Sequence, residues 1–178
     1  MSGFRLRVRL DPAPDHRAQL AAYPDDDLWP DFAVVTSGMI AIDLGPHAIG
    51  YRHGRLTPLP AGTASPAAWL PDYLGGLLHR LASAVRQLQP GQSTTAHLLD
   101  APAALTFTRE EDDQVTVSYV SAGRRIYTVR VPLAEVRAAV AGALDEFLTA
   151  LLAINPRLAE HPDVVALQAH RAALAGPA

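Results

Sequence analysis

The sequence contains no cysteine and no lysine, and each absence limits what the protein can do. Without cysteine, disulfide bonds and thiol chemistry are excluded. Without lysine, every basic side chain other than histidine is an arginine, and together with abundant Ala, Pro and Leu this indicates a GC-rich bacterial genome. The net charge of −3 is mild, which argues against a nucleic-acid-binding surface.

Long hydrophobic runs are also missing from the sequence. No apolar stretch approaches the length needed to cross a membrane, and the first residues lack the apolar core of a signal peptide. We therefore expect a cytoplasmic protein that makes no membrane contact. A chain of 178 residues with 49% hydrophobic content is long enough to form one domain around a packed core.

The clearest pattern lies in residues 114 to 154. Apolar and polar residues alternate on both sides of a glycine-containing turn, which predicts a β-hairpin that ends at Pro132. A helix is then predicted over 132–154, where apolar residues recur every three or four positions and acidic residues such as Glu146 fall off the stripe. The stripe consists of Leu133, Val136, Val140, Leu144, Phe147 and Leu151. We expect this core helix to pack across the hairpin and the sheet, with Leu144 and Phe147 central, and we expect Glu146 to be dispensable.

The first predicted strand, residues 4 to 10, has two different faces. Apolar residues alternate with Arg5, Arg7 and Arg9, so one face is apolar and the other carries three positive charges. The arginine face is either a solvated outer surface or a surface that binds anions or an acidic partner. The residues alone leave both interpretations open.

The remaining patterns predict an α+β domain that spans 1–178. Residues 1–131 are expected to be mostly strands, with one leucine-rich helix at about 66–89, for which a later start at Pro71 is the alternative. A last helix at about 156–175 is only weakly amphipathic, so we expect it to be peripheral and dispensable for the core. The predicted architecture is an antiparallel sheet of about six to eight strands with two main helices packed on one face.

An acidic stretch with the sequence YPDDDLWPD follows the first strand at residues 23 to 31. Its oxygen-bearing side chains lack the spacing and the glycine of a calcium-binding loop. It is either an exposed acidic loop or an acidic patch with an aromatic anchor that contacts a basic partner. For the second interpretation, the candidate partner-binding residues are Asp25, Asp26, Asp27, Trp29 and Asp31.

Motifs of known catalytic or metal sites are absent from the sequence. The seven histidines show neither HxH nor HExxH spacing, and GxSxG, GxGxxG and P-loop sequences do not occur. We therefore expect no metal and no cofactor. Asp43 and His47 lie near a predicted turn and can form an acid–base pair, and with His53 they define an alternative pocket for a small molecule or a substrate.

The order of the predicted elements resembles that of a known family. A first strand is followed by an acidic loop with Asp27-Leu28-Trp29, a strand pair, a leucine-rich helix, a hairpin and a closing helix, over about residues 4 to 154. This order resembles the WapI-type immunity proteins of bacterial polymorphic toxin systems. The resemblance implies a non-catalytic protein that binds and blocks a toxin through a variable surface. We therefore expect a protein-binding module, and a small-molecule-binding protein or enzyme is the alternative.

Overall fold

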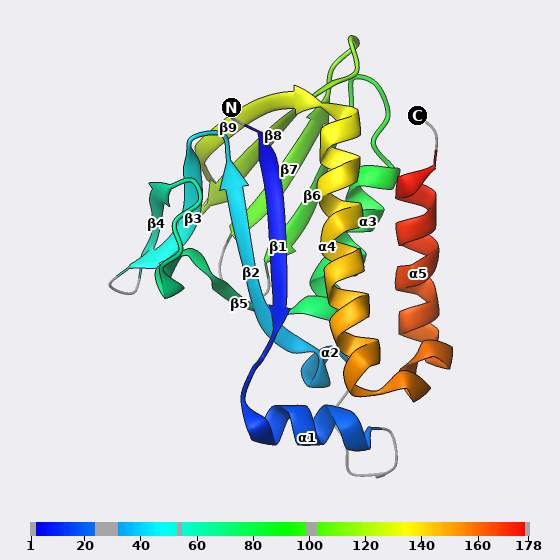
Figure 1. Ribbon diagram of the computed structural model, residues 1–178. Helices are drawn as coiled ribbons and strands as arrows, with labels where there is room; N and C mark the ends of the chain where they lie inside the picture. Colours follow the sequence, from blue (N-terminus) through cyan, green and yellow to red (C-terminus); the bar gives the residue numbers. More distant parts are fainter. Residues whose placement is uncertain (1–2, 24–31, 53–54, 99–102, 177–178) are drawn as a thin grey trace.

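The computed structural model describes residues 3–23, 32–52, 55–98 and 103–176. Within these ranges the chain is α+β, as predicted, with two antiparallel sheets and three long helices (Figure 1). No helix in this part of the chain has the length and apolar character needed to cross a membrane.

The first sheet, sheet A, contains five strands. Its main path runs β1–β2–β3–β4, and β5 pairs separately with the beginning of β2. The strands are β1 (Phe4–Leu10), β2 (Ser37–Leu44), β3 (His47–Arg52), β4 (Arg55–Pro60) and β5 (Leu70–Tyr73). Two short helices, α1 (Pro14–Ala22) and α2 (Phe32–Val35), stand between β1 and β2 in the chain.

The second sheet, sheet B, is a four-stranded meander. It consists of β6 (Ser93–Leu98), β7 (Ala103–Arg109), β8 (Gln114–Ser121) and β9 (Arg124–Pro132) in that order. At the turn between β8 and β9, Ala122 and Gly123 have φ values of 48° and 74°. Two consecutive left-handed residues match the twist of the flanking strands, so the turn supports the hairpin predicted from the sequence.

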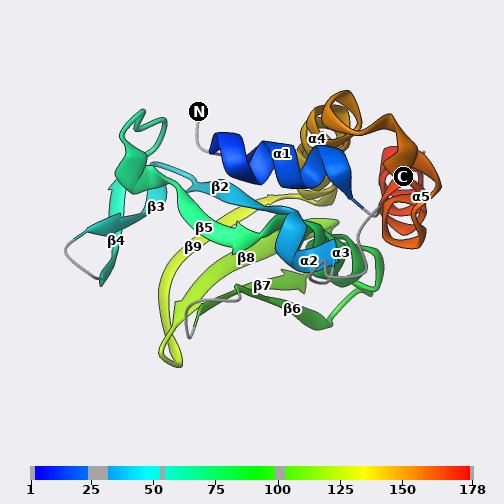
Figure 2. The same cartoon turned by 90° about the horizontal axis from the view of Figure 1, so that it is seen from below.

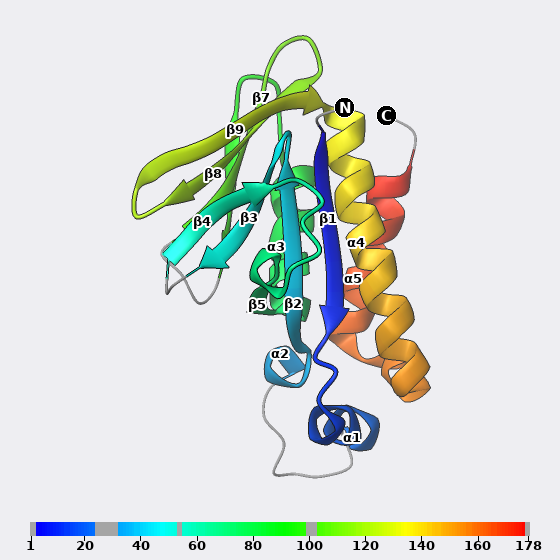
Figure 3. The same cartoon turned by 60° about the vertical axis from the view of Figure 1, so that its left-hand side comes forward.

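Three helices close the space beside the two sheets: α3 (Leu74–Arg86), α4 (Leu133–Ile154) and α5 (Pro162–Ala175). Figure 2 shows the sheets as two layers with the helices at one side. Helix α4 lies along β1, and α5 lies beyond α4 and against α3 (Figures 1 and 3). Short 3-10 turns, η1 (Pro66–Ala68) and η2 (Pro156–Glu160), precede β5 and α5.

The core lies between the inner faces of the sheets and the apolar sides of the helices. Phe4 of sheet A meets Phe107 of sheet B edge to face, with ring centroids 6.0 Å apart. The apolar stripe predicted for the long helix is fully buried here, and α4 has the predicted bounds. Burial of each large side chain contributes about 1.5–3 kcal/mol, so α4 is a major part of the core.

The free edge of β1 is covered by α4. The backbone N–H of Phe4 donates to Oε1 of Glu135 at 2.7 Å, and that of Val8 donates to Oε2 of Glu146 at 3.1 Å. An uncovered edge strand exposes unpaired N–H and C=O groups that can pair with another chain. The two carboxylates therefore accept hydrogen bonds from backbone N–H groups that could otherwise pair with a strand of another chain.

Three parts of the predicted architecture require correction. The fold has two sheets instead of one, because α3 follows β5 directly and carries the chain away before β6 begins. The helix expected at 66–89 begins only at Leu74, since residues 70–73 pair with β2 as a strand. Helix α4 lies mainly along β1 of sheet A and makes fewer close contacts with the β8–β9 hairpin, although its buried stripe shares the core with both strands of the hairpin.

The C-terminal helix is not peripheral. Val164, Leu167 and Leu174 of α5 are buried and belong to the main core cluster, and His170 is 8% exposed. Helix α5 contacts both α3 and α4. The buried residues Val164, Leu167, His170 and Leu174 lie on one side of α5, and because one of them is a histidine, the apolar stripe is weaker in the sequence than the burial in the structure.

Candidate functional site

The outer face of sheet A carries a row of arginines beside a tryptophan. In the register between β1 and β2, Arg5 pairs with Asp43, Arg7 with Ala41 and Arg9 with Met39. Directly opposed residues point to the same side of a sheet, so the three arginines and their partners share the outer face.

Trp69 reaches these arginines because of the register of β5. Leu70 pairs with Ile40, so the preceding residue, Trp69, lies opposite Ala41 on the outer face. Ala41 is small and leaves room above it for the indole ring. The guanidinium carbon of Arg9 lies 4.4 Å from the ring centroid, and that of Arg7 lies 5.5 Å away. Both distances are typical of cation–π contacts.

The segment before Trp69 is fixed on the sheet. The hydroxyl oxygen of Ser65 accepts a hydrogen bond from the N–H of Ala67 and caps the turn η1. Below this turn, a Cβ atom at Gly50 would lie only 2.6 Å from the carbonyl oxygen of Ala67. The absence of a side chain at Gly50 therefore lets this segment approach β3 closely, and Trp69 follows directly from it.

Asp43 lies beneath the arginine row and forms an ion pair with one of its members. It is 6% exposed, and its Oδ2 lies 3.5 Å from a terminal nitrogen of Arg7, while Oδ1 has no hydrogen-bond partner among the described residues. Within the same residues, Arg5 and Arg9 form no ion pair. We call Arg5, Arg7, Arg9, Asp43 and Trp69 the arginine–tryptophan face.

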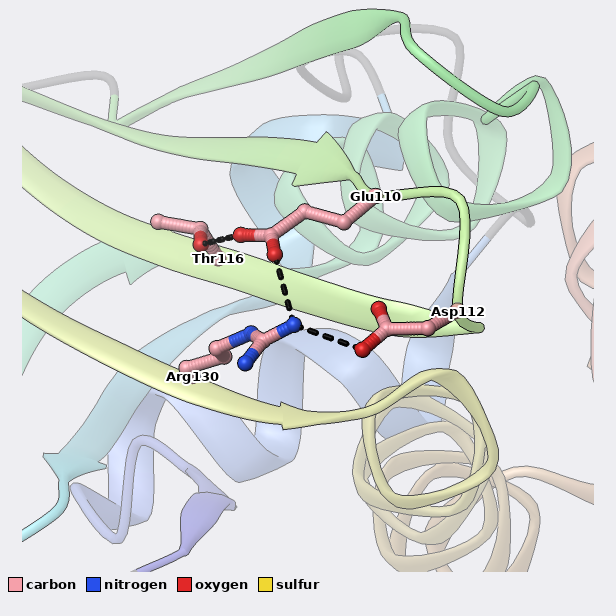
Figure 4. A network of polar contacts seen from close by, with 4 residues as sticks. All are labelled: Glu110, Asp112, Thr116 and Arg130. Atoms are coloured by element: carbon pink, nitrogen blue, oxygen red, sulfur yellow. Dashed lines mark hydrogen bonds and ion pairs between the residues drawn. The ribbon is translucent and has the colours of Figure 1, made fainter.

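The charged residues of sheet B are arranged differently. Arg130 of β9 contacts Glu110 at 2.8 Å and Asp112 at 2.7 Å, and Thr116 donates to the other oxygen of Glu110 (Figure 4). Arg109 likewise pairs with Asp113. Three of the four carboxylates between β7 and β8 therefore pair with an arginine of β7 or β9, unlike the row on β1.

A second polar cluster joins α3 to α5. Arg86 lies 2.9 Å from Nδ1 of His170, and Nε2 of His170 lies 3.3 Å from Nδ1 of His79. A guanidinium only donates, so Nδ1 of His170 accepts and its proton is assigned to Nε2. His170 then donates to His79, whose own proton is placed on Nε2.

This cluster keeps His170 uncharged. Burial lowers the pKa of His170 below its usual value, and the charges of His79 and Arg86 lower it further. The pair suits a metal ion poorly, because Arg86 occupies one nitrogen of His170 and the other needs its proton for His79. Among the described residues, no group of three or more His, Asp or Glu side chains is placed to hold a metal.

A pocket of about 320 Å³ lies next to this cluster, between α2, α3 and α5. Phe32 and Leu167 form apolar walls, and Phe32 stacks on His161 with ring centroids 4.6 Å apart. The polar lining consists of His79, Arg80 and Asp163. Its size and mixed lining fit a small polar ligand.

The structure separates the residues of the alternative pocket predicted from the sequence. Asp43 pairs with Ala48 and His47 pairs with Leu44, so Asp43 and His47 point to opposite faces of sheet A. His47 packs instead against Tyr127 of sheet B, with ring centroids 4.6 Å apart. The third member, His53, lies outside the described residues.

The acidic patch predicted to bind a basic partner also lies outside the described residues. It comprises Asp25, Asp26, Asp27, Trp29 and Asp31, and its role stays a prediction. The sequence did single out the arginine alternation of β1, but it did not link Trp69 to it. Residue 69 falls in the expected helix, and only the pairing of β5 with β2 places it beside the arginines.

Comparisons with protein-family models, curated proteins and solved structures give no significant match to this chain. The resemblance in element order to WapI-type immunity proteins stays an expectation.

Proposed function

We propose that the protein is a non-catalytic protein-binding module and that the arginine–tryptophan face is its binding surface. The supporting observation is Arg9, which stacks on Trp69 at 4.4 Å without an ion pair among the described residues. Trp and Arg dominate the binding energy of many protein interfaces. A guanidinium already held against an aromatic ring loses less conformational freedom on binding, so more of its contact energy appears as affinity.

Catalysis has weaker support from the geometry. Asp43 and His47, the acid–base pair suggested by the sequence, lie on opposite faces of sheet A. The Nδ1 atom of His79 is already engaged by Nε2 of His170 at 3.3 Å. His47 and His79 therefore give little support for a general base, whereas His16 has its Nε2 3.1 Å from the hydroxyl oxygen of Ser37.

A narrower form of the proposal is that the partner is a toxin that the protein neutralises in the cytoplasm. It is supported only by the resemblance in element order to WapI-type immunity proteins. The test is co-expression with a toxic protein encoded by a neighbouring gene. Restored growth supports the narrower form, provided that Trp69→Ala abolishes the rescue; rescue that does not depend on Trp69 contradicts the assignment of the surface.

The general proposal is tested by photo-cross-linking in the source cells. A photoreactive residue at Met39, beside Arg9, should capture a partner that the same residue at the exposed Thr128 of sheet B does not capture. The purified partner should bind the unmodified protein at least about tenfold more tightly than it binds Trp69→Ala or Arg9→Gln, a difference of about 1.4 kcal/mol. Unchanged affinity in both variants would contradict the proposal.

The alternative is a small-molecule-binding protein or enzyme, and the pocket between α2, α3 and α5 is the observation that favours it. A thermal-shift screen with small polar metabolites tests this function. A ligand that raises the melting temperature of the unmodified protein, but not of a His79→Ala variant, would support the pocket as a binding site.

A further inference from the structure

We infer that the arginine–tryptophan face binds an extended acidic segment of a partner protein, an inference that rests on the proposed function. The face presents three arginines from a single strand and one carboxylate, and that carboxylate, Asp43, is buried beneath Arg7. The arginines of the face therefore outnumber its single carboxylate, although Glu135 and Glu146 of α4 border Arg5 and Arg7 and the whole chain carries a net charge of −3. A surface of this kind attracts negatively charged groups.

The spacing of the arginines favours an extended partner. Alternate residues of a strand lie about 6.6–6.8 Å apart, so Arg5, Arg7 and Arg9 form a straight row about 13–14 Å long. Acidic residues at every second position of an extended peptide have the same separation. Carboxylates of the partner at this spacing can therefore face Arg5 and Arg9, whereas Arg7 is already paired with Asp43 and lies over Trp69.

Stacking on Trp69 orients Arg9 for this contact. The guanidinium carbon of Arg9 is held over the indole ring at 4.4 Å, and a guanidinium in this position can still donate to both oxygens of a carboxylate. The indole ring is itself engaged by Arg7 and Arg9, so it is poorly placed to stack on a nucleobase. The face therefore suits carboxylates better than a single-stranded nucleic acid.

A hollow continues from the row beyond Arg9. It is about 510 Å³ in volume, and Met39, Pro71 and Tyr73 contribute to its lining together with Val34, which is 41% exposed. These side chains offer an apolar surface at one end of the arginine row, and Asp11 and Asp72 also line the hollow. The partner segment is therefore expected to carry an apolar residue directly after its last acidic residue, on the Arg9 side.

The inference is tested with labelled synthetic peptides and the full-length protein in a fluorescence-anisotropy titration. The main probe has glutamate at every second position, threonine between, and leucine at one end. Comparison probes have the glutamates gathered at one end, lysine in place of glutamate, or single-stranded DNA of equal charge. Arg9→Gln and Arg5→Gln are the test variants, Arg9→Lys is the conservative variant, and Arg125→Gln on the exposed strand β9 is the matched control.

We expect the alternating peptide to bind best and to weaken as salt is added, because exposed charge pairs are screened. Arg9→Gln should weaken binding about tenfold and Arg5→Gln by a smaller factor. Arg9→Lys should give an intermediate loss, since lysine keeps the charge but neither the stack nor the bidentate contact. Arg125→Gln should leave the affinity unchanged.

Three results would overturn the inference. If the clustered peptide binds as tightly as the alternating peptide, the partner is not recognised in an extended register. If Arg9→Gln and Arg125→Gln lose the same amount of affinity, the peptide does not bind at the arginine–tryptophan face. Tighter binding of single-stranded DNA than of any peptide would assign the face to nucleic acid. If no acidic peptide binds but the cross-linked partner still depends on Trp69, the inference fails while the proposed binding function stands.

Discussion

Helix α4 provides a direct test of how the structure is held together, because neighbouring residues on it have different roles. Phe147 is buried in the core, Glu146 accepts a hydrogen bond from the edge of β1, and Thr149 is exposed. The sequence predicts that Glu146 is dispensable, and its contact with Val8 leads to a different expectation. The perturbation is therefore a set of three alanine substitutions at these positions.

The magnitudes follow from the contacts. Truncation of a buried phenylalanine costs about 3–5 kcal/mol, a large share of the ~5–15 kcal/mol that stabilises a domain. Glu146→Ala leaves the N–H of Val8 without its charged acceptor, a loss of about 1.5–3 kcal/mol when fully buried. Because Glu146 is itself exposed and water can replace part of this contact, we expect Glu146→Ala to lower the free energy of unfolding by about 1 kcal/mol. Thr149→Ala should change stability by less than about 0.5 kcal/mol.

Urea denaturation at neutral pH, followed by circular dichroism, measures all three differences as midpoint shifts. The expected order of destabilisation is Phe147→Ala, then Glu146→Ala, then Thr149→Ala. Equal midpoints for the Glu146 and Thr149 variants would show that the carboxylate does not hold the strand edge. A small effect of Phe147→Ala would mean that α4 faces solvent or a partner chain instead of the core.

Four further predictions concern the C-terminal helix, two titrating groups and metal content. Truncation after Asn155 removes the buried Val164 and Leu167, so the shortened chain should lose its cooperative urea transition; a retained transition would show that α5 is dispensable. His170 has a lowered pKa in the folded state, so the unfolded state binds the proton first and stability should fall as the pH drops below about 6.5. Melts at several pH values should show a smaller fall in a His170→Gln variant. Burial raises the pKa of Tyr119 to about 12, so stability should be complete below pH 10.0, the usual value, and should decline as the pH rises toward 12; Tyr119→Phe should remove this decline. Elemental analysis of untagged protein should find no stoichiometric metal, and zinc whose chelation unfolds the chain would contradict this prediction.

The parts of the fold that the sequence predicts well are those with strong local patterns. The β8–β9 hairpin depends on alternation and on a two-residue turn, and α4 depends on a long stripe that begins after Pro132. Both signals lie within about forty residues of continuous sequence. The alternation in β1 likewise identified the arginine face, because alternate residues of a strand point to opposite sides of the sheet and can be assigned from the sequence alone.

The parts that the sequence does not predict depend on pairing between distant segments. Alternation shows which face of a strand is apolar but not which strand it joins, so the division into two sheets was not foreseeable. Four residues, 70–73, are too few to reveal β5, and the leucine-rich stripe after them suggested a longer helix. Trp69 enters the site only through the pairing of β5 with β2, and no local pattern signals it.

The same structure limits how a partner can approach β1. The inner face of the strand is buried through Phe4 and its apolar neighbours, and the free edge lies against α4 with two of its N–H groups bound to Glu135 and Glu146. Strand addition at this edge would require α4 to move away, which would open the core that α4 shares with α3 and α5. The outer face is therefore the part of β1 that remains accessible. A partner there contacts arginine side chains and not backbone groups, so the binding should depend on charge and be weakened by salt.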